Sequence, residues 1–143
     1  MRDGNNGEKR RCHRFFIIIQ HVRVLNKLNS FFLKSLPTFD PHLSVISIYE
    51  IELGAFRAGR LSDIATLQVD FKVLPLTEEI ARRAAKLDVS LIRQNLQIGI
   101  KDTFIAATCL AHDLPLLTVN IRHFDRIDGL QLIDLNTLPF ITE

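Results

Sequence analysis

Long apolar runs and closely spaced cysteines are both missing from this 143-residue sequence. No stretch approaches the roughly 20 apolar residues that a membrane-spanning helix needs. The apolar run from Phe15 to Ile19 is interrupted by polar residues from Gln20 onward, which leaves it too short for a secretory signal. Two cysteines, Cys12 and Cys109, are too few for a disulfide framework or a zinc site. We therefore expect a cytoplasmic protein in which Cys109 is a small core residue.

Charge is distributed unevenly along the chain. Residues 1–30 hold seven Lys and Arg against two Asp and Glu, although the formal net charge of the whole sequence is only +2. Such a basic segment can attract phosphate groups, or it can simply be a solvated tail. We predict a mobile basic tail over residues 1–11 and a single domain over residues 12–143, a length that can bury one core.

Strand and helix patterns alternate through the rest of the sequence. Residues 15–19 suit either a buried strand or the start of a helix, because a short apolar run does not separate the two. Strands are predicted at 43–46, 71–76, 114–118 and 130–135, and helices at 24–36, 47–56, 61–67, 77–92 and 102–112. This alternation predicts an α/β fold with three α/β/α layers and a mostly parallel central sheet.

Polar residues gather where the predicted strands end. Asp102 lies at the start of a predicted helix, Asn120 lies just past a predicted strand, and Glu50 lies on the first turns of another helix. The carboxyl ends of parallel strands share one edge of a sheet, and ligand sites form there. Two carboxylates from separate elements suit Mg²⁺, which prefers oxygen ligands and keeps several waters. A divalent-metal site is therefore a serious hypothesis.

These segments resemble the PIN domain family, and in particular the VapC-type toxins of prokaryotic toxin–antitoxin pairs. The family pattern S-x-x-T/S-x-x-E-x-x-x-G is matched by Ser44, Ser47, Glu50 and Gly54. The pattern D-x-x-I-A-A-T is matched by Asp102, Ile105, Ala106, Ala107 and Thr108, and T-x-N-x-x-x-F by Thr118, Asn120 and Phe124. The motifs occur in the family order and at family-like spacing. Their combination is therefore a more specific signal than any one of them alone.

The resemblance implies a three-layer PIN-like domain and a ribonuclease that cleaves RNA with Mg²⁺ or Mn²⁺. It implies that Glu50 and Asp102 bind the metal, and that Thr118, Asn120 and His123 orient water or close the site. It further implies a homodimer that pairs with a small VapB-like antitoxin.

Each of these residues also has a simpler interpretation. Asp102 suits a helix cap, Glu50 an exposed helix acid, and Asn120 the cap of a following helix. His123 stands where many relatives have Asp or Glu, and a single surface histidine is usually just solvated. Lys101 either neutralises substrate charge or points into water.

The sequence departs from the family at its amino terminus. Relatives have a strand ending in Asp-Thr-Asn roughly thirty-five to forty residues before the motif glutamate, and no such tripeptide occurs in the first forty residues here. Two hypotheses remain open: a degenerate relative that lost one acid, or a shifted reading frame that replaced the first strand. An intact Asp-Thr-Asn in another frame of the upstream genomic sequence would support the second.

Two rival functions follow from the same sequence. A catalytically impaired PIN-like module would bind RNA or an antitoxin without cleaving. A phosphoacceptor receiver domain would need paired acids after the first strand and a lysine after a late strand, and neither is visible.

Overall fold

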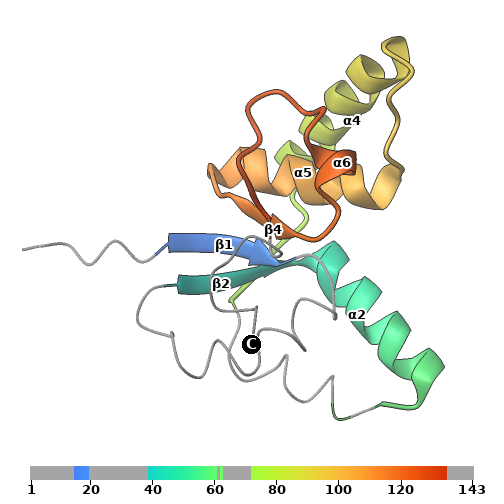
Figure 1. The fold of residues 1–143 in the computed structure, drawn as a ribbon, viewed down its shortest axis with the longest axis vertical. Helices are drawn as coiled ribbons and strands as arrows, with labels where there is room; N and C mark the ends of the chain where they lie inside the picture. The colour runs from blue at the N-terminus through green and yellow to red at the C-terminus, as the bar shows by residue number, and fades with distance from the viewer. Residues whose placement is uncertain (1–14, 20–38, 61, 63–71, 135–143) are drawn as a thin grey trace, which may run out of the picture.

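A computed structural model describes residues 15–19, 39–60, 62 and 72–134, and these residues form a parallel α/β fold (Figure 1). Five strands make one sheet in the order β3-β2-β1-β4-β5, and every neighbouring pair is parallel. The strands are β1 Phe15–Ile19, β2 Phe39–Ser44, β3 Lys72–Leu74, β4 Leu116–Thr118 and β5 Leu132–Asp134. The helices are α2 Val45–Ala58, α4 Glu78–Arg93, α5 Ile100–His112 and α6 Ile121–Phe124.

The described helices lie on either side of the level of the sheet. In Figure 1, α4, α5 and α6 lie above strands β1 and β2, whereas α2 runs away below them. The chain first moves outward from β1 through β2 to β3, and then crosses back to place β4 and β5 on the other side of β1. Strand β1 is therefore the centre of the sheet, and the strand order reverses between β1 and β4.

The structure resolves the ambiguous apolar run as strand. Residues 15–19 form β1, whose last residue, Ile19, lies opposite Leu117 of β4 in the sheet. The predicted tail at 1–11 and the predicted helix at 24–36 lie outside the described residues, as does the predicted helix at 61–67 apart from Ser62. Within the described part of the chain, no helix is long and apolar enough to span a membrane.

Helix α2 begins two residues earlier than predicted because a serine caps it. The Ser44 Oγ accepts a hydrogen bond from the Ser47 backbone N–H at 2.9 Å and lies 2.9 Å from the Ser47 hydroxyl. This pairing satisfies a backbone donor that the helix itself leaves unpaired. The helix ends at Gly59, whose left-handed φ of 67° lets its N–H reach the carbonyls of Ala55 and Phe56.

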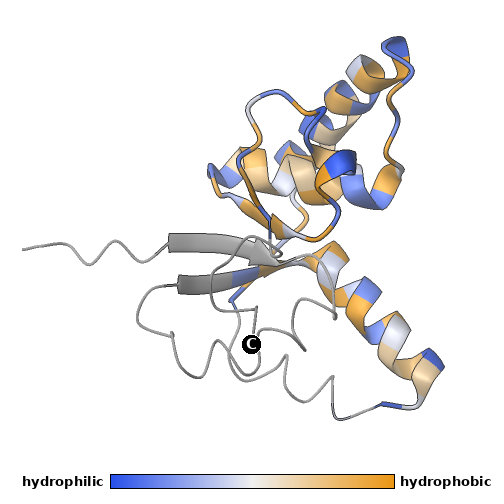
Figure 2. Ribbon diagram, viewed as in Figure 1, coloured by the Kyte–Doolittle hydropathy of each residue, from blue (hydrophilic) through white to orange (hydrophobic). Residues whose placement is uncertain are grey.

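Helix α4 follows the predicted pattern at its start and departs from it at its end. The Thr77 hydroxyl accepts from the Ile80 N–H at 3.2 Å, and Glu78 and Glu79 occupy the first turn. Figure 2 shows the resulting contrast between polar and apolar residues along the helix. The helical spacing of Ile80, Ala84, Leu87, Leu91 and Ile92 predicts one buried stripe, but Ile92 is 55% exposed. Successive residues of a helix point about 100° apart, so Leu91 faces the core while Ile92 faces solvent.

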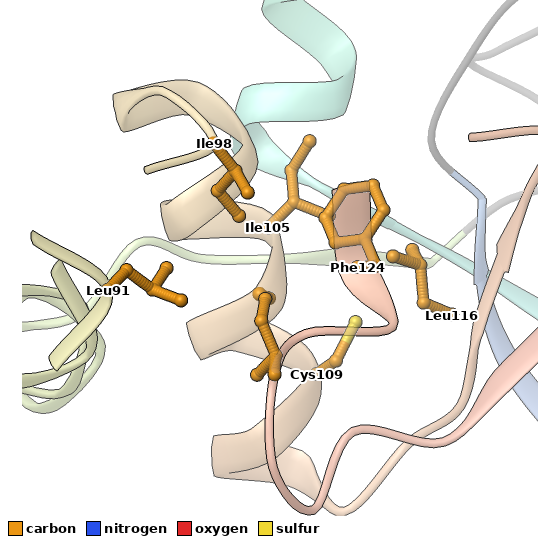
Figure 3. Close-up of a cluster of buried hydrophobic side chains, with 8 residues drawn as sticks. Leu91, Ile98, Ile105, Cys109, Leu116 and Phe124 are labelled. Atoms are coloured by element: carbon orange, nitrogen blue, oxygen red, sulfur yellow. The ribbon is translucent and has the colours of Figure 1, made fainter. Parts of the chain in front are cut away.

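Helix α5 is the most deeply packed helix of the described structure. Residues 105–109 are all buried, and the small side chains among them let the helix lie close to its neighbours. Figure 3 shows Leu91 of α4, Leu116 of β4 and Phe124 of α6 gathered around Ile105 and Cys109 of α5. Cys109 is a core residue as predicted, and burial raises the pKa of its thiol, so it is no nucleophile.

The burial of Leu91 and the exposure of Ile92 yield a matched test of this packing. Leu91→Ala should lower the free energy of unfolding by roughly 2–5 kcal/mol, because it leaves a cavity between α4 and α5. Ile92→Ala should change the free energy by no more than about 0.5 kcal/mol, because its side chain is already in water. Urea denaturation measures both. Equal losses in the two variants would contradict the described register of α4.

Candidate active site

The carboxyl ends of the central strands bring the predicted site residues to one edge of the sheet. Strand β2 ends at Ser44 and strand β4 ends at Thr118, and both side chains are buried. Because β1 lies between these two strands and all three are parallel, the segments that follow β2 and β4 leave the sheet at the same edge. The strand order reverses here, which is where open α/β sheets bind ligands.

Glu50 reaches from helix α2 to the start of helix α5. Its Oε1 lies 3.5 Å from the Nζ of Lys101, and its side chain is only 12% exposed. Glu50 is therefore not the ordinary exposed helix acid of the simpler interpretation. Lys101 does not simply point into water either, although its side chain is 52% exposed.

Asp102 lies in the first turn of α5 but does not cap the helix. The cap is Gly99, whose φ of 93° and ψ of 149° suit glycine, and Asp102 is the third helical residue. The capping interpretation is therefore wrong. A carboxylate in this turn is still stabilised by the positive end of the helix dipole, and the 15% exposed side chain leaves it reachable from outside.

His123 joins the site through helix α6. Its Nδ1 lies 3.1 Å from the Asp102 Oδ2, and its side chain is 46% exposed. The histidine therefore contacts the Asp102 carboxylate and is not merely solvated. Asp125, the nearby acid that could take the place of His123, is exposed, and its backbone N–H donates to the Ile121 carbonyl at the end of α6.

Thr118 and Asn120 shape the turn between β4 and α6. The Thr118 Oγ1 accepts a hydrogen bond from the Asn120 backbone N–H at 2.9 Å, and Thr118 is fully buried. Asn120 occupies the cap position of α6, yet its side chain makes no capping hydrogen bond. The buried hydroxyl therefore fixes the turn that presents His123 to Asp102.

A hydrogen bond to α4, which the sequence analysis did not predict, holds the first turn of α5. The Thr103 hydroxyl lies 2.8 Å from the Asp88 Oδ1 of α4 and 2.9 Å from the Gly99 carbonyl oxygen. Thr103 is fully buried and directly follows Asp102. Asp88 and Thr103 lie fifteen positions apart on separate helices, and no local pattern pairs them.

Glu50 contacts Lys101, the residue that directly precedes Asp102 in the first turn of α5. Two carboxylates that are largely removed from water fit a hard cation that keeps most of its waters and needs only one or two protein ligands. The described residues hold no group of three or more His, Cys, Asp or Glu side chains arranged for a metal. The donor set of the described residues fits a cation that shares its coordination with water or substrate.

Comparison with known proteins agrees with this architecture. The family model described as PIN domain matches residues 19–130. This match begins at the last residue of β1, so the similarity extends further toward the amino terminus than the motifs from Leu43 onward suggested.

Curated relatives and solved structures point the same way. The chain is 31% identical over 115 residues to Ribonuclease VapC10 of Mycobacterium tuberculosis, covering 80% of this chain and 86% of the relative. It is 30% identical over 103 residues to Ribonuclease VapC1 of Rickettsia felis, covering 67% and 77% of the two chains.

Two of the structurally similar proteins come from toxin–antitoxin complexes. The structure of VapBC2 from Rickettsia felis bound to a promoter DNA fragment has a TM-score of 0.70 at 18% identity, covering 84% of this chain and 98% of the other. That of VapBC-1 from nontypeable Haemophilus influenzae has a TM-score of 0.68 at 25% identity, with 84% and 97% coverage. On the family match and the identity to these relatives, the chain belongs to the PIN domain family, among its VapC-type members.

Proposed function

We propose that this protein is a VapC-type toxin that hydrolyses phosphodiester bonds of RNA with the help of Mg²⁺ or Mn²⁺. The observation that carries the proposal is the pairing of Asp102 with His123 beside the Glu50–Lys101 pair, where the sheet reverses its strand order. The names of the curated relatives support the reaction, since they are ribonucleases.

Each side chain has a distinct task in this proposal. Glu50 and Asp102 would hold the ion, which when bound lowers the pKa of a coordinated water and offsets charge on the phosphoryl group. His123 is bound to Asp102 through Nδ1, which leaves its other ring nitrogen to orient a water or a phosphate oxygen. Thr118 and Asn120 keep that histidine in place through their turn. No side chain at the site has to act as a nucleophile.

The proposed partners follow from the solved relatives. Several are complexes of a VapC with a VapB protein, so we propose a VapB-like antitoxin as the partner of this chain and a homodimer as its own assembly. A partly exposed site at the edge of a sheet is accessible to an extended RNA strand or to a peptide that blocks it.

One observation favours a second candidate function, a PIN-like module that binds RNA or an antitoxin without cleaving. The first forty residues contain no Asp-Thr-Asn, the tripeptide in which the resemblance implies a further aspartate of the site. Both carboxylates of the site also already have a nitrogen partner. This candidate predicts weak Mn²⁺ binding or none.

The two candidates separate in an RNA cleavage assay on the purified full chain. With Mn²⁺, the ribonuclease should cleave RNA, EDTA should abolish cleavage, and Asp102→Asn should reduce the rate at least about a hundredfold, because catalysis loses a charged ligand. Asp113→Asn is the matched control, since Asp113 lies at the opposite end of α5 and asparagine tolerates its left-handed backbone. Cleavage that survives both EDTA and Asp102→Asn would refute the metal mechanism. No cleavage by the wild type would favour the binding module.

The task given to His123 leads to a second expected result. His123→Ala should lower kcat roughly tenfold to a hundredfold. This loss is smaller than that of a metal ligand, because His123 orients a water or a phosphate oxygen and does not bind the ion. His112→Ala should leave kcat unchanged, since His112 is exposed in the last turn of α5. Thermal melting of both variants checks that the fold is intact. A kcat for His123→Ala equal to that of wild type would remove the histidine from the mechanism.

A further inference from the structure

Lys101 pairs with one of the two carboxylates of the proposed metal site. Its Nζ is 3.5 Å from the Glu50 Oε1, and it directly precedes Asp102. We propose that Lys101 is a tethered counter-ion that competes with divalent cations for Glu50 and so sets the cation affinity of the site. This inference rests on the proposed metal site at Glu50 and Asp102.

Burial explains why Glu50 needs such a partner. Its side chain is only 12% exposed, and an ionised carboxylate that has lost most of its water is costly unless an opposite charge compensates it. The ammonium group of Lys101 supplies that compensation within the chain. Glu50 can therefore stay ionised and in place before any cation arrives.

The unequal exposure of the two partners makes the contact reversible. The Lys101 side chain is 52% exposed, and its flexible stem can move the strongly hydrated ammonium into water. A divalent ion that reaches Glu50 replaces the ammonium there. Displacement costs the ion pair but restores full hydration of Lys101, and the released group is then free to meet a substrate phosphate.

Charge shows why this competition affects cation affinity. Glu50, Asp102 and Lys101 together carry one negative charge, whereas the two carboxylates alone would carry two. The positive charge of Lys101 therefore cancels half of the formal charge with which these two carboxylates attract a divalent ion.

The test measures Mn²⁺ binding to the full chain without RNA, by the electron paramagnetic resonance signal of free Mn²⁺. Lys101→Met should bind Mn²⁺ roughly threefold to tenfold more tightly than wild type, a range set by a partly screened ion pair. Lys101→Arg keeps the charge and should stay within about twofold of wild type. Lys86→Met, at an exposed lysine on α4, should do the same and controls for the loss of any lysine.

The outcomes distinguish this inference from the proposed metal site. If wild type binds Mn²⁺, Asp102→Asn does not, and Lys101→Met matches wild type or binds more weakly, the inference is wrong and the metal site stands. If Lys101→Met binds Mn²⁺ and wild type does not, Lys101 competes so strongly for Glu50 that it prevents Mn²⁺ binding, and the inference is confirmed. If neither binds, both ideas fail. Melting curves in EDTA verify folding, and Lys101→Gln replaces the methionine variant if that one is unfolded.

Discussion

The close packing of helix α5 is the constraint on which the rest of this structure depends. Its buried face carries small side chains from Ala106 to Cys109, so the helix lies tightly between α4 and the sheet. A helix packed in this way cannot turn about its axis without opening voids, and interiors tolerate voids poorly. The direction of its first turn is thereby set, and the first turn carries both Lys101 and Asp102.

The polar side of α5 depends on the same packing. Thr103 is buried and hydrogen-bonded to Asp88, so the residue next to Asp102 is tied to α4. On the opposite side, Glu50 of α2 and His123 of α6 approach from the two elements that follow β2 and β4. All buried side-chain polar atoms of the described residues have a hydrogen-bond partner. The side chains of the candidate site are therefore held by contacts within the protein.

The charge of the candidate site depends on the ion pair between Glu50 and Lys101. Strand β1 holds the centre of the sheet through backbone pairing with β2 and β4, and these parallel neighbours direct the following segments to one edge. At that edge Glu50 and Asp102 carry two negative charges and Lys101 carries one positive charge. The Lys101–Glu50 contact therefore sets much of the charge that a ligand would meet.

Local sequence signals determined much of this protein. Alternating strand and helix patterns predicted the parallel α/β class, the Thr77 cap predicted the start of α4, and the motifs carrying Glu50 and Asp102 identified the helices that bear the site. These features depend on neighbours within a few residues, whose spacing is visible in the chain.

Tertiary structure alone decided the rest. Residues 15–19 became strand because β2 and β4 pair with them, and Asp102 proved not to be a cap because Gly99 takes that place. Ile92 is exposed whereas Leu91 beside it is buried, because the rotation of α4 against its neighbours turns only Leu91 into the core. The partners Lys101 for Glu50, His123 for Asp102 and Asp88 for Thr103 come from different helices. Such pairs arise only when packing fixes the distance and rotation of whole helices, which no local spacing encodes.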